Sequence, residues 1–334
     1  MTAETGRSVG RKVGIRGSKK VSASQPASTG RALSASNETL DPRTSLARNG
    51  RSFFWASRLL GSQMAARAAG LYAFCRVLDD MADGDIPGGP DRLASIKTRL
   101  QNGSGPVDPA LAGFLPLMAE TGIPARPLLH LIDGLLQDQQ EVALEEEADL
   151  LRYCYRVAGT VGLMICPVLD CRDQAAWPFA IDLGMAMQMT NIARDVLEDA
   201  QLGRRYLPAS WAGPISPAGI SRAASQPGSA EARQIRQATA RLLGLADRYY
   251  RSAEAGMGAL PWRARAAIMV AGRVYRQIGV ELQAGGLNWQ AGRVVTSNFS
   301  KSRASLAGLL ALPRVPGRLP AHDKSLHDAL AGLV

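Results

Sequence analysis

Apolar residues recur at helical spacing along most of the chain, and no segment shows a convincing alternation of apolar and polar residues. Spacings of three and four residues are typical of amphipathic helices, whereas strict alternation is typical of strands. We therefore predict an all-α chain without strands, in which Pro, Gly and Ser make 203–229 a long loop. The predicted helices span 52–83, 91–101, 108–120, 128–147, 149–171, 175–201, 230–255 and 262–287.

The two ends of the chain lack this periodicity, so we expect one helical domain over 43–300. Residues 1–42 combine Ser, Gly and Ala with basic residues, a composition typical of disorder. Such an arm suits either an Arg- and Ser-rich targeting peptide or contact with an anionic membrane. Residues 301–334 form a tail with a predicted short helix, whose leucines at 306, 309 and 310 share one face. That face would either rest on a membrane or pack against the body.

The formal net charge of +10 is concentrated in these ends. Residues 1–35 hold seven basic residues against one acidic residue, and 301–334 hold five against two, so the body is nearly neutral. A nucleic-acid-binding domain carries a basic folded face, which argues against nucleic acid as a partner. Hydrophobic residues make up 46% of the chain, enough for a sizeable core, yet no apolar run reaches the roughly 18 residues of a spanning helix.

Cysteine and histidine offer little for metal or nucleophilic chemistry. The four cysteines form no Cys-x-x-Cys pair and no apolar secretory segment precedes them, so we expect free thiols in a reducing compartment. Of the three histidines, His322 and His327 lie in the tail. A histidine-ligated zinc site or a histidine-based triad is therefore not expected.

Two acidic motifs lie on predicted helices in distant parts of the chain. In YAFCRVLDDMAD at 72–83, Asp79 and Asp83 are four residues apart, and Arg76 lies one turn before them. Residues four apart share a helix face, so each motif presents a carboxylate pair beside an arginine. The second motif places four polar residues on one stripe, next to Arg194: Gln188, Asn191, Asp195 and Asp199.

Carboxylate and amide oxygens without sulfur or imidazole suit a hard cation such as Mg²⁺ or Mn²⁺. Two sparse acidic stripes facing each other indicate a metal-bridged polyphosphate, for which arginines would supply bidentate anchors. The surrounding aromatic and methionine residues indicate an apolar cavity below that site, which fits a prenyl diphosphate.

Each feature alone has a simpler explanation. An acidic helix face is often only solvated, as we expect for Glu145–Glu147, and aromatic residues at helical spacing more often form a core than a substrate wall. Arg204 and Arg205 follow a predicted helix and could serve only its C-terminal dipole. The two motifs together, with Asn191 and the arginines, are harder to explain in this way.

Four stretches, in this order, resemble the squalene/phytoene synthase family and within it the bacterial phytoene synthases. They are YAFCRVLDDMAD at 72–83, YCYRVAGTVG at 153–162, QMTNIARDVLED at 188–199 and GRRYLP at 203–208. The resemblance covers roughly 45–300 and implies an isoprenoid synthase fold, a helical bundle around a central apolar cavity with Mg²⁺ at its mouth.

The resemblance also implies roles for individual residues. Tyr155 would lie beside the cavity and act with the aspartates in catalysis, and Gly50 replaces the first serine of the family's Ser-x-Ser-Phe flap. The implied metal ligands are Asp79, Asp80, Asp83, Asn191, Asp195 and Asp199. The implied substrate contacts are Ser52, Phe53, Arg76, Gln188, Asn191, Arg194, Tyr275 and Arg293.

The implied reaction joins two geranylgeranyl diphosphates head to head, through prephytoene diphosphate, to phytoene with release of diphosphate. This is the first committed step of carotenoid biosynthesis. The implied cofactor is Mg²⁺ or Mn²⁺, and NADPH is not expected. Because substrate and product are very hydrophobic, we expect a cytoplasmic protein with peripheral membrane contact and downstream carotenoid enzymes as partners.

Three alternatives stay open at this point. Squalene synthase and dehydrosqualene synthase act on farnesyl diphosphate, and chain length depends on a cavity depth that the sequence does not give directly. Squalene synthase would also need NADPH. A non-catalytic assembly factor with the same fold would be expected to lose aspartates from one or both motifs, whereas all five are intact here.

Overall fold

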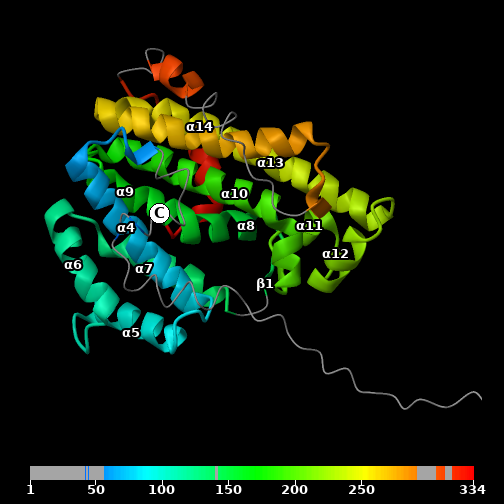
Figure 1. Cartoon of the computed structure of the whole chain (residues 1–334), viewed down its shortest axis with the longest axis horizontal. Helices are drawn as coiled ribbons and strands as arrows, with labels where there is room; N and C mark the ends of the chain where they lie inside the picture. Colours follow the sequence, from blue (N-terminus) through cyan, green and yellow to red (C-terminus); the bar gives the residue numbers. More distant parts are fainter. Residues whose placement is uncertain (1–41, 43, 45–55, 140–141, 292–305, 313–317) are drawn as a thin grey trace, which may run out of the picture.

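Helices make up nearly all the regular structure of the chain (Figure 1). The computed structural model describes residues 42, 44, 56–139, 142–291, 306–312 and 318–334. The predicted all-α class is confirmed. The long helices are α4 (Ser62–Ala82), α5 (Gly89–Asn102), α6 (Pro109–Thr121), α7 (Ala125–Gln137), α8 (Glu147–Cys154), α9 (Thr160–Val168), α10 (Trp177–Gln201), α12 (Pro217–Ala224), α13 (Ala230–Gly256) and α14 (Trp262–Ala284).

Polar residues and glycines fix where several of these helices begin and end. Asp108 accepts a hydrogen bond from the Ala110 backbone N–H at the start of α6, and Ser229 does the same for Ala232 at the start of α13. These side chains satisfy backbone donors that the first helical turn leaves without partners. Gly122 ends α6 in the left-handed conformation that glycine adopts without strain.

Helix α10 runs through the centre of the molecule, packed against α9, α13 and α14 (Figure 1). Its buried methionines, Met185 and Met189, join residues of α13 and α14 in the larger of the two main apolar cores. The second core lies between α4, α5, α6 and α7, where Phe74 stacks on Phe114. The two cores place α4 on one side of the molecule and the C-terminal half of α10 opposite it.

The segments around 140 and 205 differ from the prediction. The helix predicted over 128–147 ends at Gln137, and β1 (Val142–Ala143) pairs in parallel with β2 (Arg204–Arg205). Arg205 stabilises this contact, because its buried guanidinium donates to the carbonyls of Leu144 and Leu207. The predicted loop at 203–229 therefore contains β2, the short helix α11 (Ala209–Ala212) and α12. Pairing across 60 residues leaves no local sequence signal.

A π-helical turn, η1 (Tyr155–Gly159), connects α8 to α9 and packs closely on α10. A Cβ atom at Gly184 would lie 2.2 Å from the carbonyl oxygen of Ala158, and one at Gly162 would lie 2.1 Å from that of Ala180. Only glycine permits backbones to approach this closely. These two contacts hold η1 and α9 against α10 beside the cavity described below.

The ends of the chain are described only in part. Almost all of the arm predicted over 1–42 lies outside the described residues. In the tail, 306–311 are helical, and the 3-10 helix η6 (Lys324–Leu330) packs on the body with Leu326 and Leu330 buried. The short helix η2 (Gln174–Ala176) precedes α10, η3 (Met257–Ala259) follows α13, and η4 (Trp289–Ala291) follows α14.

Candidate active site

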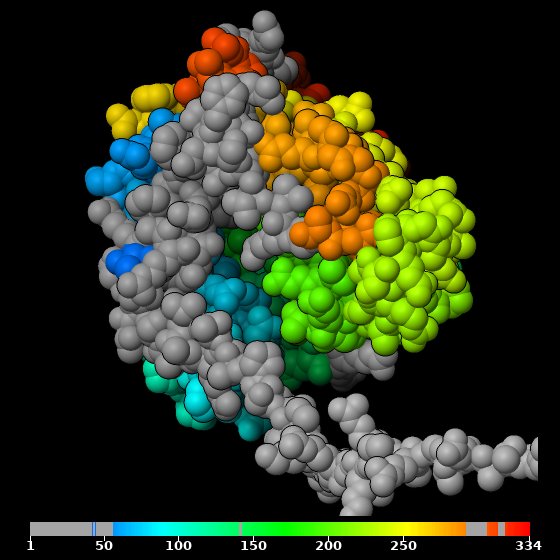
Figure 2. Space-filling view, turned by 45° about the vertical axis from the view of Figure 1, so that its right-hand side comes forward, coloured from blue at the N-terminus to red at the C-terminus, as the bar shows by residue number. Residues whose placement is uncertain are grey.

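An apolar cavity of about 450 Å³ lies between α4, α7, α9, α10 and α14. A second, polar recess of about 290 Å³ adjoins it, and the blue segments around α4 and the green segments around α10 meet on this face (Figure 2). Five polar residues line both spaces: Asp79, Asp138, Tyr153, Gln188 and Asn191. The polar recess therefore opens directly onto the apolar cavity.

The last turns of α4 supply one wall of the polar recess. Arg76 donates to Asp79 over 2.7 Å, so arginine and carboxylate one turn apart form an ion pair at the junction of the two spaces. Asp83 ends the helix, and its Oδ1 lies 3.1 Å from Nη2 of Arg204. The predicted helical register of the first motif is thus present, with a cation beside each of its rim carboxylates.

Asp80 does not lie with Asp79 and Asp83. Its side chain is fully buried, it forms an ion pair with Arg76, and it lines neither the cavity nor the recess. A helix turns each successive residue by about 100°, which directs Asp80 behind the rim. This position does not fit the metal-ligand role predicted for Asp80 and instead suits a carboxylate that holds Arg76 in place.

The second wall comes from α10, which supplies Gln188, Asn191, Arg194, Asp195 and Asp199. The backbone leaves helical geometry at Asp195, where φ is −105° and ψ is 16°. Adjacent residues do not face each other on a regular helix, yet here Nε of Arg194 donates to Asp195 over 2.8 Å. The distortion therefore turns the Asp195 carboxylate toward Arg194 within the polar recess.

A carboxylate that the sequence reasoning missed completes the polar recess. The hydroxyl of Tyr153 donates to Asp138 over 2.8 Å, and the Tyr153 ring stacks on Tyr206. All three residues line the recess. Asp138 follows α7 and belongs to neither of the two aspartate motifs, so the only available signal was its position after an apolar helix. A role at the helix C-terminus was one explanation that the sequence left open for Arg204, and the structure places this residue at the recess.

Burial and crowding raise the pKa values of three of these carboxyl groups. Withdrawal from water raises the pKa of Asp79 to about 6 against the opposing effect of Arg76, and Asp83 adds to the rise. Withdrawal from water likewise raises the pKa of Asp138 to about 6 and that of Asp199 to about 7. Asp195 contributes to the rise at Asp199. The carboxylates of the site thus carry more negative charge than the neighbouring arginines neutralise.

The polar recess fits a divalent cation by its own composition. Of the described residues that line it, five are aspartates and two are arginines, so a diphosphate would be repelled unless positive charge were added. Oδ1 of Asn191 and Oδ1 of Asp138 are buried without a hydrogen-bond partner in the described structure. Buried oxygens of this kind need a partner, and hard cations prefer such ligands.

Other predicted residues lie elsewhere. Tyr155 is buried outside both spaces, where its hydroxyl donates to the Leu333 carbonyl over 3.3 Å and contacts His130. The tyrosine at the recess is Tyr153, because the two side chains project from different faces of the same turn. Tyr275 lines the apolar cavity, as does Tyr72, one of the aromatic residues that indicated this cavity in the sequence. Ser52, Phe53 and Arg293 lie outside the described residues.

Comparison with known proteins identifies the family. A family model for squalene/phytoene synthase matches residues 46–300. The chain belongs to this family. It is 39% identical over 255 residues to 15-cis-phytoene synthase of Enterobacter agglomerans, covering 72% of this chain and 84% of that enzyme. It is 33% identical over 297 residues to 15-cis-phytoene synthase of Paracoccus sp., covering 84% and 95%.

Solved structures of the family have the same fold. A dehydrosqualene synthase in complex with a ligand matches with a TM-score of 0.67 and 25% identity, over 85% of this chain and 99% of that one. Squalene synthase HpnC from Alicyclobacillus acidocaldarius matches with a TM-score of 0.63 and 20% identity, over 77% and 97%. The resemblance drawn from four sequence motifs and the isoprenoid synthase fold that it implied are therefore confirmed.

Proposed function

We propose that the protein is a phytoene synthase, a prenyltransferase that joins two geranylgeranyl diphosphates head to head and releases diphosphate. The observation that carries this proposal is the polar, carboxylate-rich recess that opens directly onto an apolar cavity. A prenyl diphosphate has the same two parts, a polyanionic head and an apolar chain. The similarity to 15-cis-phytoene synthases over most of the chain supports this enzyme over others of the same fold.

Mg²⁺ is the cation that we propose for the polar recess. Asp79 and Asp83 would hold it from α4, and Asn191, Asp195 and Asp199 would hold it from α10. When bound, Mg²⁺ supplies Lewis-acid stabilisation of a departing diphosphate and neutralises its charge. The donor set of carboxylate and amide oxygens, without sulfur or imidazole, favours Mg²⁺ or Mn²⁺ over softer metals.

The arginines of the site bind and orient the diphosphate groups. Arg76 lines the junction of the two spaces, and Arg194 and Arg204 line the polar recess. Asp80 orients Arg76 from behind, and Asp195 orients Arg194. Guanidinium groups held in this way are pre-organised for bidentate contacts to phosphate oxygens, so they stabilise the leaving group without reorganising.

The walls of the apolar cavity protect reactive carbocations from water. Leu71, Leu183 and Met187 lie among its lining residues, as do Tyr72 and Tyr275. Apolar walls exclude the water that would quench a cation. The aromatic rings present electron-rich faces, which attract positive charge.

Membrane contact is part of the proposal, because phytoene and the prenyl chain of its precursor are apolar. In the tail helix at 306–311, Leu306 and Leu310 are 59% and 66% exposed, and Leu309 is exposed as well. Gly308 faces the backbone of Met269 and Val270 on α14, so the helix packs through its glycine and presents leucines outward. Among the described residues, no helix combines the length and apolarity needed to cross a bilayer.

Product analysis tests the proposed function. Purified full-length protein, given labelled geranylgeranyl diphosphate and Mg²⁺ without reductant, is expected to form phytoene. Farnesyl diphosphate offered in competition is expected to be used less. A requirement for NADPH would instead favour a squalene-type enzyme, and exclusive use of farnesyl diphosphate without NADPH would favour a dehydrosqualene synthase.

A further inference from the structure

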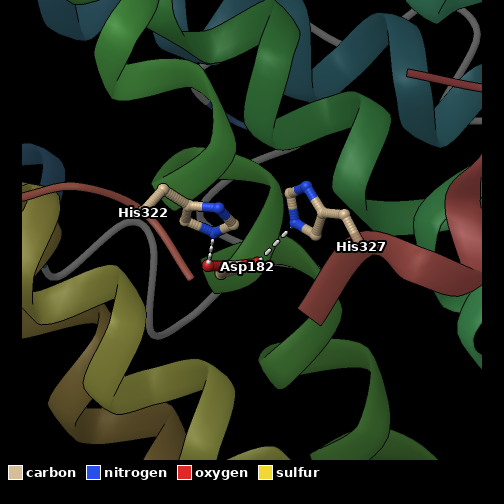
Figure 3. A group of neighbouring side chains, drawn as sticks. All are labelled: Asp182, His322 and His327. Carbon is tan, nitrogen blue, oxygen red and sulfur yellow. Dashed lines mark hydrogen bonds and ion pairs between the residues drawn. The ribbon is translucent and has the colours of Figure 1, made fainter. Parts of the chain in front are cut away.

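Two of the chain's three histidines converge on one buried carboxylate, far from the polar recess. Nε2 of His322 lies 2.8 Å from Oδ2 of Asp182, and Nε2 of His327 lies 2.7 Å from Oδ1 (Figure 3). Asp182 belongs to α10, and thirteen residues separate it from Asp195, about 20 Å along the helix axis. The cluster is therefore separate from the diphosphate site.

We propose that Asp182, His322 and His327 form a zinc site that fastens the C-terminal tail to α10. Their ligand atoms all lie within 4.8 Å of one another. Imidazole nitrogen and carboxylate oxygen are zinc ligands, and three protein ligands with water in the fourth position form a common zinc coordination sphere. Such ligands lie roughly 3.4 Å apart around a tetrahedral ion, which a small outward shift of the two rings provides.

The surroundings of Asp182 favour a bound cation beside its buried carboxylate. Its side chain is fully buried, and in the described part of the chain no arginine or lysine forms an ion pair with it. A buried carboxylate is costly unless charge and hydrogen bonds compensate it. Here Ser252 on α13 donates to Oδ2 over 2.5 Å, which fixes the orientation of the carboxylate as outer-sphere partners of zinc ligands do.

Both histidines can offer a nitrogen lone pair to zinc while each ring stays neutral. In the metal-free form each ring donates its Nε2–H to Asp182. Zinc binding moves that proton to Nδ1 within each neutral ring, so Nε2 becomes the ligand and no proton needs to leave the site. The His322 and His327 side chains are 10% and 11% exposed, which leaves access for the ion and for a water ligand.

Zinc bound at this site would hold the C-terminal tail against the body of the protein. Between the histidines and the C-terminus, Leu326 and Leu330 are buried in the larger core, and Tyr249 donates to the Leu326 carbonyl over 2.6 Å. The family model ends at residue 300, so both histidines lie beyond the residues that it matches. From the sequence, a histidine zinc site is not expected because both residues lie in the tail, whereas the fold returns that tail to α10.

Cobalt spectroscopy of the full chain tests the proposal. The protein is treated with a chelator, excess Mg²⁺ is added to occupy hard oxygen sites, and Co²⁺ is titrated. The expected result is the intense visible absorption of tetrahedral Co²⁺, saturating at one equivalent and displaced by Zn²⁺. His327→Gln and the isosteric Asp182→Asn are expected to lose it, whereas Asp195→Asn in the polar recess keeps it. Absence of the band, or its loss in Asp195→Asn alone, would overturn the proposal.

A second measurement does not depend on the folding of one variant. Zn²⁺ is expected to raise the Tm of the wild-type protein and slow carboxypeptidase digestion of its tail, with no such change in His327→Gln or Asp182→Asn. Ser252→Ala keeps all three ligands and is expected to weaken zinc binding about 10- to 100-fold, as loss of an outer-sphere partner does. A Zn²⁺ effect equal in wild type and both ligand variants would show that the tail is held by hydrogen bonds alone.

Discussion

Nη2 of Arg204 lies 3.1 Å from Oδ1 of Asp83, joining the strand after α10 to the end of α4. The two walls of the polar recess are therefore tied together by a cation that is also placed to contact a diphosphate. Arg204→Gln is expected to lower kcat/KM about 10- to 100-fold, because a charged hydrogen bond contributes about 1.5–3 kcal/mol. Steady-state kinetics with geranylgeranyl diphosphate measures this.

Arg241→Gln is the matched control for that change. Arg241 pairs with Glu147 on the surface, and its side chain is 57% exposed, so its ion pair contributes little. Its kcat/KM is expected to stay within a factor of two of wild type. Equal losses in Arg204→Gln and Arg241→Gln would mean that Arg204 has no special role at the recess.

Asp80 and Asp79 are adjacent but are expected to respond differently to substitution. Asp79→Asn is expected to raise the Mg²⁺ concentration for half-maximal rate, because Asp79 lines the recess. Asp80→Asn is expected to lower the free energy of unfolding by about 1–3 kcal/mol, because it removes a buried partner of Arg76. Mg²⁺ titrations and urea unfolding of both variants separate the two roles. An equal rise in Mg²⁺ requirement would restore Asp80 as a ligand.

The spacing within the two motifs was sufficient to predict which of their own residues meet at the polar recess. Asp79 and Asp83 share one helix face, and Gln188, Asn191 and Asp199 share another, because helical geometry is local. The same helical geometry explains why Asp80, an implied metal ligand, is buried behind the rim in the structure. Asp195 kept its predicted place only through a backbone distortion, which spacing does not encode.

Features that depend on tertiary contacts could not be predicted from the sequence. Asp138 reaches the recess because α7 ends beside α8, where Tyr153 hydrogen-bonds to it. The pairing of β1 with β2 has no local period, so the helix predicted over 128–147 was drawn too long. His322 and His327 were discounted for their position in the chain, whereas burial of Leu326 and Leu330 returns that segment to the core.

Without divalent cations, the free energy of unfolding is expected to fall as pH rises from about 4 to 7. The pKa of Asp138 is raised to about 6 and that of Asp199 to about 7, from an ordinary value of 3.8. In this window the folded state binds more protons than the unfolded state, so stability is highest below pH 3.8 for these groups and is lost as each ionises. Added Mg²⁺ is expected to restore stability most at high pH.

Urea midpoints at pH 5 and pH 8, with chelator or with Mg²⁺, measure this dependence. Asp138→Asn carries no titrating carboxyl at that position and is expected to show a smaller difference between the two pH values. Stability that rises with pH in the presence of chelator would contradict the proton uptake inferred for these carboxyls.

The close approach of η1 to α10 is expected to tolerate no side chain at Gly184. A methyl group there would lie 2.2 Å from the Ala158 carbonyl oxygen, and overpacking of this kind costs about 1–3 kcal/mol. Gly184→Ala is therefore expected to lower both Tm and activity, since Ala158 lines the cavity. Gly244→Ala is the control, because Gly244 is an exposed position in α13 with open space around it. It is expected to raise stability by about 0.5–1 kcal/mol.

The deep end of the apolar cavity is expected to set the length of prenyl chain that the enzyme accepts. Ala180 lines the cavity near the start of α10, eleven residues before Asn191 and about 16 Å from it along the helix. Ala180→Leu would fill that end, so it is expected to lower kcat/KM for geranylgeranyl diphosphate at least about tenfold relative to farnesyl diphosphate, in line with discrimination by apolar pockets. Ala180→Ser hardly changes the volume and is expected to leave the ratio unchanged. An unchanged ratio in a folded Ala180→Leu protein would mean that chain length is measured elsewhere in the cavity.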